Sequence, residues 1–121
     1  MLRRVVPSTQ VKLTWALVNP PQKKFGRAKA VTEGEAKVID VSFEGAFLVT
    51  CRAELVMPKS KLSIHHGTDA CHAIVRRVAA INDPQTSAWG VTFHDFSPGF
   101  WVFLNELLST GYLIPDTPIQ H

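Results

Sequence analysis

The chain has 121 residues, of which 45% are hydrophobic and 19% are charged. This composition predicts one compact domain with its own core, and excludes a multidomain enzyme and a disordered tail. The formal net charge of +3 is unevenly distributed, because residues 1–30 contain seven Lys or Arg and no Asp or Glu, whereas residues 31–121 contain six basic and ten acidic side chains. This polarity predicts an anionic partner for the N-terminal part of the chain.

The apolar runs and the cysteines of the sequence predict a protein that is not inserted in a membrane and that lies in a reducing compartment. No uninterrupted apolar run approaches the roughly 18 residues that cross a bilayer, so no membrane insertion is expected. A signal peptide would need an apolar stretch after Arg3 and Arg4, but this stretch is interrupted by Pro7, Ser8, Thr9, Gln10 and Lys12, and a cytoplasmic location is therefore expected. Cys51 and Cys71 belong to no disulfide or zinc motif, which predicts two reduced thiols.

Short segments of alternating or continuous apolar residues, separated by turn residues, predict six strands. They cover Val11–Val18, Glu35–Val41, Ala46–Cys51, Lys61–His65, Ala70–Ile81 and Ala88–Phe93. Phe43–Gly45 is predicted to form a tight turn, and Gln22–Gly34 a basic loop after the first strand. Six short strands with this spacing are typical of a small all-β barrel or sandwich.

A single helix is predicted after the strands. Ser97–Gly99 supplies an N-cap serine and a proline at the first helical position, and Gly111 marks the end. Its apolar residues fall on one broad face, as in an amphipathic helix that closes a barrel. We therefore expect residues 1–10 to form a flexible basic arm, residues 11–111 the barrel with its helix, and residues 112–121 a tail.

The hexapeptide Asp40–Gly45 is the most informative motif in the chain. Asp40 and Ser42 lie two residues apart at a strand end, which places a carboxylate and a hydroxyl on the same side of the sheet, where both accept hydrogen bonds. Gly45 permits the positive φ that a tight turn requires. Asx or Ser turn chemistry before a hairpin explains the same residues without any ligand.

The Asp-x-Ser-x-x-Gly pattern of Asp40–Gly45 resembles the [DN]-x-S-x-x-G motif of PilZ domains. The similarity covers most of the chain, since a basic arm precedes the first strand, the motif follows the second strand, and a Gly-Val-x-Phe strand at residues 90–93 precedes a helix. The resemblance implies a six-stranded antiparallel β-barrel with a C-terminal helix. It also implies binding of the bacterial second messenger cyclic di-GMP, with no other cofactor.

Ligand binding in PilZ domains also uses an Arg-x-x-x-Arg motif on the N-terminal arm. A guanidinium fork suits both phosphate and the O6/N7 edge of guanine. When Val11 and Leu13 set the register, Arg4 occupies the first position of this motif and Ser8 the second, so the motif is degenerate. Binding is expected to order the arm and to change the surface shown to a protein partner. The ligand-binding residues implied by the resemblance are Arg3, Arg4, Asp40, Ser42 and Gly45.

The sequence also bears on two functions other than nucleotide binding. A PilZ-fold adaptor that has lost nucleotide binding and acts by protein contact is favoured by Ser8 and by the aromatic-rich helix Phe100–Leu108. Binding of single-stranded nucleic acid is not expected, because the aromatic residues are not interleaved with the basic ones as a stacking surface requires.

Neither a catalytic site nor a metal site is expected. His65 and His66 are neighbours on a predicted strand and point to opposite faces, and the same holds for Cys71 and His72. Ser42 has no general base at a readable spacing.

Arg76 and Arg77 lie in the middle of the fifth predicted strand. Alternation places one of them outward and leaves the other to reach Asp40 or a bound ligand. An exposed strand arginine without any ligand is the simpler alternative.

Overall fold

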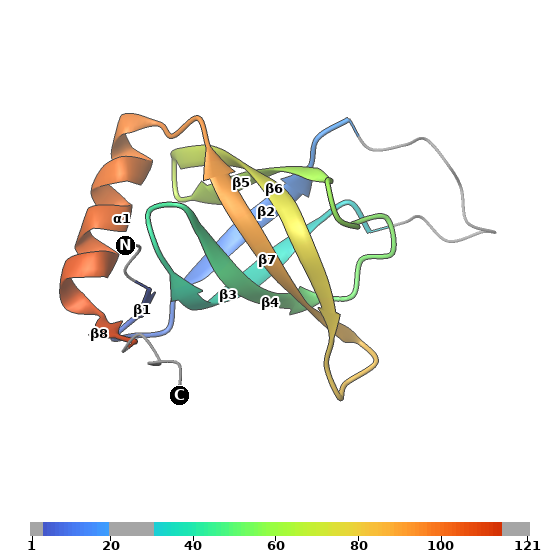
Figure 1. Ribbon diagram of the computed structural model, residues 1–121. Coiled ribbons are helices and arrows are strands. Elements are labelled where there is room, and N and C mark those ends of the chain that lie inside the picture. The colour runs from blue at the N-terminus through green and yellow to red at the C-terminus, as the bar shows by residue number, and fades with distance from the viewer. Residues whose placement is uncertain (1–3, 20–30, 115–121) are drawn as a thin grey trace, which may run out of the picture.

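The structure is a computed structural model that describes residues 4–19 and 31–114. Six strands form the barrel (Figure 1): β2 (Lys12–Leu17), β3 (Glu33–Val41), β4 (Gly45–Cys51), β5 (Lys61–His66), β6 (Asp69–Ala80) and β7 (Thr86–His94). They are antiparallel neighbours in the order β2-β5-β6-β7-β4-β3, and pairing of β2 with β3 closes the sheet. The predicted all-β, six-stranded antiparallel barrel with one C-terminal helix is confirmed.

The core of the barrel is built around two tryptophans on facing strands. Trp15 on β2 and Trp89 on β7 are almost completely buried and meet edge to face, with ring centroids 4.8 Å apart. Each indole N–H has an internal partner, since Trp15 Nε1 donates to Thr50 Oγ1 at 2.9 Å and Trp89 Nε1 donates to Ser87 Oγ at 3.0 Å. Large apolar surface is thus buried without an unsatisfied indole donor.

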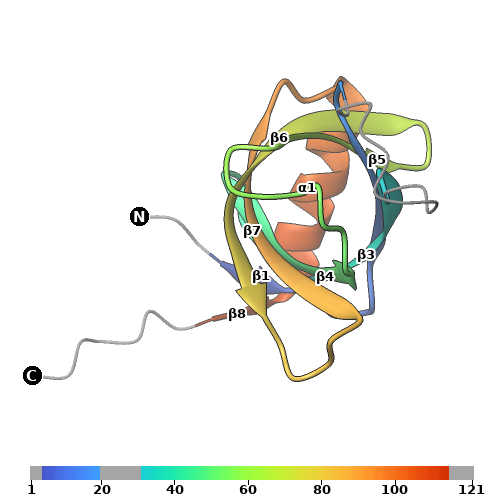
Figure 2. The same cartoon turned by 90° about the vertical axis from the view of Figure 1, so that its right-hand side faces the viewer.

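The helix α1 (Pro98–Thr110) covers one end of the barrel, where it is seen through the opening in Figure 2. It begins as predicted after Ser97, whose Oγ accepts from the Phe100 N–H at 3.2 Å and from the Ala70 N–H of β6 at 3.1 Å. One side chain therefore caps the helix and ties it to the barrel. Among the described residues, no helix combines the length and the apolar character that a membrane span requires.

Two short strands extend the sheet at the helix end. β1 (Val5–Val6) pairs with β3 and with β8 (Tyr112–Leu113), and the Ile114 N–H donates to the Arg4 carbonyl at 2.9 Å. The sequence prediction placed these segments in the arm and the tail, because two-residue strands show no alternation. Residues 1–3 and 115–121 lie outside the described residues. Val5 is thus paired on both sides, and the carbonyl of the preceding Arg4 is tied to the chain after β8.

The loop predicted over Gln22–Gly34 is shorter in the structure, because β3 already begins at Glu33. Residues 22–30 of that loop lie outside the described residues. Thr32 also takes part in the barrel, since its carbonyl accepts from the Leu17 N–H at 2.7 Å. The additional residues extend the pairing of β3 with β2.

A β-bulge interrupts each of the strands β3 and β6. The pairing of β3 shifts by one residue at Ile39, and the pairing of β6 shifts at Arg76. Strict alternation would have pointed Asp40 and Arg77 into the barrel, where an unpaired charge is costly. The extra residue in each strand keeps both charged side chains on the outer surface, and on β3 it also returns Val41 to the core, where it is 1% exposed.

The two cysteines are free thiols in different environments. Cys51 is exposed, whereas Cys71 is 3% exposed inside the barrel, and burial raises the pKa of the Cys71 thiol from 9.0 to about 12. Because the thiolate is the reactive form, we expect a disulfide-exchange reagent at about pH 8 to label one thiol quickly in the folded protein and two in denaturant. Stability from neutral Cys71 should decline as the pH rises from 9.0 toward about 12.

Replacement of Cys51 by serine is the control for this labelling experiment. The Cys51→Ser protein should show no fast thiol until it is unfolded, because only the buried Cys71 then remains. Two fast thiols in the folded wild type would contradict the burial of Cys71.

Candidate functional site

A pocket of about 460 Å³ lies on the outer face of the barrel, across β4, β7 and β6. Three arginines and one carboxylate border it, and two glycines form part of its floor. These residues are Arg4, Arg76, Arg77, Glu44, Gly45 and Gly90. The pocket therefore has an excess of positive charge around a floor that contains exposed backbone.

The two glycines of the pocket differ in the space around their Cα atoms. A Cβ at Gly45 would overlap the Val91 carbonyl oxygen of the neighbouring strand, so Gly45 is required for close approach of β4 to β7. The expected positive φ at Gly45 is wrong, because Gly67 is the only described glycine with a positive φ. At Gly90 the nearest atom to an added Cβ is Arg77 Cβ, 3.8 Å away, so this position has free space.

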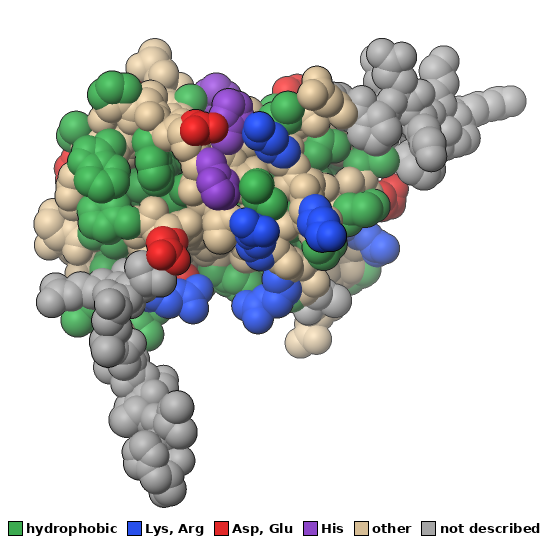
Figure 3. All heavy atoms as spheres, turned by 45° about the horizontal axis from the view of Figure 1, so that its top comes forward, with side chains coloured by type: hydrophobic (Ala, Val, Ile, Leu, Met, Phe, Trp, Pro, Cys, Tyr) green, Lys and Arg blue, Asp and Glu red, His purple; other side chains and the backbone are tan. Residues whose placement is uncertain are grey.

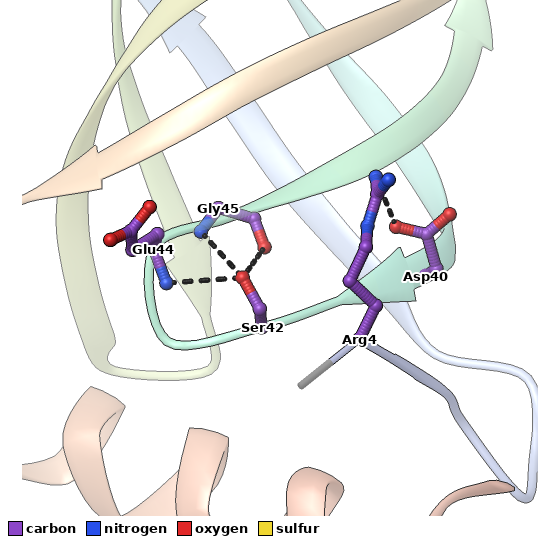
Figure 4. Close-up of polar contacts among 5 residues, drawn as sticks. All are labelled: Arg4, Asp40, Ser42, Glu44 and Gly45. Carbon is purple, nitrogen blue, oxygen red and sulfur yellow. Dashed lines mark hydrogen bonds and ion pairs between the residues drawn. The ribbon is translucent and has the colours of Figure 1, made fainter. Parts of the chain in front are cut away.

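Ser42 shapes the turn between β3 and β4. The Ser42 hydroxyl accepts from the Glu44 N–H at 3.2 Å and from the Gly45 N–H at 3.3 Å. The backbone N–H of Ser42 donates to the Gly45 carbonyl at 2.8 Å. Figure 4 shows the hydroxyl turned into this turn. The Ser-turn interpretation of the motif thus accounts for the hydrogen bonds of Ser42, which is 8% exposed.

Arg4 and Asp40 form an ion pair at the edge of the pocket. Arg4 Nη2 donates to Asp40 Oδ1 at 2.9 Å, and the two side chains are 57% and 16% exposed (Figure 4). An ion pair this exposed stabilises a fold by less than about 1 kcal/mol. Its main effect is to orient the guanidinium, which keeps further N–H donors available for a ligand.

The predicted site residues are only partly assembled. Arg4, Ser42 and Gly45 line the pocket, and Asp40 contacts it through Arg4. Arg3 lies outside the described residues. Ser8, at the second position of the degenerate arginine motif, is exposed and is not among the residues that line the pocket.

The sequence allowed one of Arg76 and Arg77 to reach a bound ligand and favoured an exposed strand arginine, whereas in the structure both line the pocket. Arg76 Nε donates to Thr92 Oγ1 at 3.0 Å, and the Arg77 guanidinium carbon lies 5.9 Å from the centre of the Phe47 ring. A signal was present in the sequence: strict alternation buries one of two adjacent arginines, and the cost of such burial indicates a bulge.

The histidines have structural contacts in the described residues. His65 Nε2 lies 2.7 Å from Ser63 Oγ, and the His66 ring stacks on Phe103 of α1 with centroids 3.8 Å apart. Across residues 4–19 and 31–114, no group of three or more His, Cys, Asp or Glu side chains is arranged to hold a metal ion.

Figure 3 shows several Lys and Arg side chains gathered on one face of the barrel, beside histidine side chains and with few acidic groups. Such a surface attracts anions before any specific contact forms.

Comparison of the chain with protein-family models, with curated proteins and with solved structures gave no match.

Proposed function

We propose that this protein is a PilZ-like signalling domain of the bacterial cytoplasm that binds cyclic di-GMP in the outer pocket and relays binding to a protein partner. One observation carries the proposal: the Asp-x-Ser-x-x-Gly turn and Arg4 border the same pocket, which two further arginines also line. A cyclic dinucleotide carries two phosphodiester anions and two flat bases, and this pocket offers guanidinium groups above a floor containing two glycines.

The phosphate groups are the natural partners of the arginines. A guanidinium binds phosphate through two parallel N–H donors and also stacks on bases. Arg4 is oriented by Asp40, and its carbonyl accepts from the Ile114 N–H next to the pairing of β1 with β8, so its side chain needs little ordering when a ligand binds.

The bases require hydrogen-bond acceptors, because the guanine N1–H and N2–H groups are donors. Ser42 is engaged in the turn, and Asp40 holds Arg4. Glu44 also lines the pocket, and no ion pair within residues 4–19 and 31–114 occupies its carboxylate. We therefore assign Glu44 to guanine recognition, with Asp40 and Ser42 as positioning residues.

Isothermal titration with cyclic di-GMP tests the proposal. The wild type should release heat on binding, and Arg4→Ala should weaken binding about tenfold to a hundredfold through loss of a charge-assisted hydrogen bond. Arg52→Ala is the matched control, since Arg52 is exposed and absent from the pocket lining. Absence of heat at high micromolar ligand would refute the proposal.

Ser8→Arg should strengthen binding if the register set by Val11 and Leu13 is correct.

A second candidate function is that of an adaptor that binds protein without nucleotide. The observation that favours it is an exposed apolar surface on the helix side, where Phe43, Trp101 and Val102 are 37%, 46% and 63% exposed. Apolar side chains grouped on a surface are typical of protein contacts. Stoichiometric recovery of a partner in the absence of nucleotide, lost in Trp101→Glu, would support this function.

A further inference from the structure

Arg76 and Arg77, named here the bulge arginines, project from one strand to the same side. The pairing of β6 with β7 joins Val75 to Val91 and Arg77 to Gly90, which leaves Arg76 as the inserted residue. Both side chains are exposed and line the outer pocket. A regular strand would have sent them to opposite faces, so the bulge creates the pair.

The bulge arginines bring two like charges together without a counterion among the residues that the structure describes. The ion pairs found there join Arg4 to Asp40 and Lys12 to Glu35, His72 Nδ1 lies 3.7 Å from Asp95 Oδ2, and none of these pairs includes a bulge arginine. Their protein contacts are neutral: Arg76 donates to the Thr92 hydroxyl, and Arg77 lies over an aromatic ring. An anion in the pocket would relieve their repulsion.

The strand register places the bulge arginines opposite Arg4. Asp40 on β3 pairs with Phe47 on β4, Phe47 pairs with Gly90 on β7, and Gly90 pairs with Arg77 on β6. Arg77 and the Asp40 partner of Arg4 therefore stand at the two ends of one row, about 14 Å apart at the usual spacing of strands. Of the two residues between them in this row, Phe47 carries the ring over which Arg77 lies, and Gly90, which has no side chain, lines the pocket.

We propose that the bulge arginines form a second phosphate-binding wall of the pocket, facing Arg4, and supply the contact that Ser8 does not provide. In its full form this inference rests on the proposed function, since the ligand that spans both walls is then the cyclic dinucleotide. Arg4 takes one phosphodiester, and the bulge arginines take the other.

Titration of cyclic di-GMP into single-site variants tests this inference. Arg76→Ala and Arg77→Ala should each weaken binding about tenfold or more, whereas Arg52→Ala should stay within about twofold of the wild type. Melting temperatures of all three variants should match the wild type, because the residues are exposed. If the wild type binds and both bulge variants bind equally well, the second wall is refuted while the proposed function stands.

A second probe separates the inference from the identity of the ligand. Inorganic pyrophosphate is titrated into the ¹⁵N-labelled protein, and the Arg76 and Arg77 Nε–H resonances are followed. Saturable shifts of both resonances would support the wall even if cyclic di-GMP gives no heat. The shift of each arginine should then be lost when the other arginine is replaced by alanine. Resonances that do not shift with pyrophosphate, in a protein that also gives no heat with cyclic di-GMP, would overturn it.

Discussion

Replacement of Gly45 by alanine is expected to destabilise the barrel by about 1–3 kcal/mol. The added Cβ would overlap the backbone carbonyl oxygen of Val91, and Val91 is 4% exposed within β7, where it pairs with β4 and β6. Backbone that is paired on both sides cannot yield as the end of a flexible side chain can. Urea unfolding, with the midpoint and slope compared with those of the wild type, measures the loss.

Gly90→Ala is the matched control for this prediction. The nearest atom to its added Cβ is Arg77 Cβ at 3.8 Å, an ordinary contact distance, so the free energy of unfolding should stay within about 0.5 kcal/mol of the wild type. The new methyl would occupy the pocket floor and should weaken cyclic di-GMP binding without loss of fold. Equal destabilisation by the two substitutions would contradict the close approach at Gly45.

Replacement of Phe100 by alanine is expected to cost about 3–5 kcal/mol of unfolding free energy. Phe100 is completely buried between α1 and the barrel end, and its ring lies 5.7 Å from Phe93, 6.0 Å from Phe96 and 5.5 Å from Phe103, centre to centre. A cavity there removes contacts from all three rings at once. Since small domains are stable by about 5–15 kcal/mol, much of the folded state should be lost at moderate temperature.

The adjacent Trp101 provides the control on the same helix. Trp101 is 46% exposed, so Trp101→Ala should cost less than about half of the Phe100→Ala effect despite removing a larger side chain. Thermal unfolding followed by circular dichroism compares the two variants. A larger loss in Trp101→Ala would mean that the helix packs on the barrel through a different face.

The six barrel strands and the helix could be predicted because their signals are local. On β2, apolar residues alternate from Leu13 to Leu17, and at the helix start Ser97 and Pro98 carry the capping signal. β1 and β8 could not be predicted, because each contains two residues and forms only through partners remote in the sequence. Their position depends on tertiary packing, such as the contact of Gly111 with Val5.

The candidate site was predictable to the extent that one hexapeptide carries it. Ser42 and Gly45 line the pocket, and Arg4 joins them through the arm register. Arg76 and Arg77 were harder to assign, because their common orientation depends on a one-residue shift between β6 and β7. Alternation within the strand indicates that a bulge is needed to keep both arginines outside, but the position of the shift is decided by burial across the whole barrel.

The turn between β3 and β4 faces two surfaces at once. Ser42, Glu44 and Gly45 line the pocket, while the Phe43 ring stacks on Trp101 of α1 with centroids 4.7 Å apart. A pocket ligand that moves this turn therefore also disturbs the exposed aromatic stack. By thermodynamic reciprocity, if a pocket ligand changes the affinity of the aromatic stack for a partner protein, binding of that protein must change the affinity of the pocket for its ligand by the same factor.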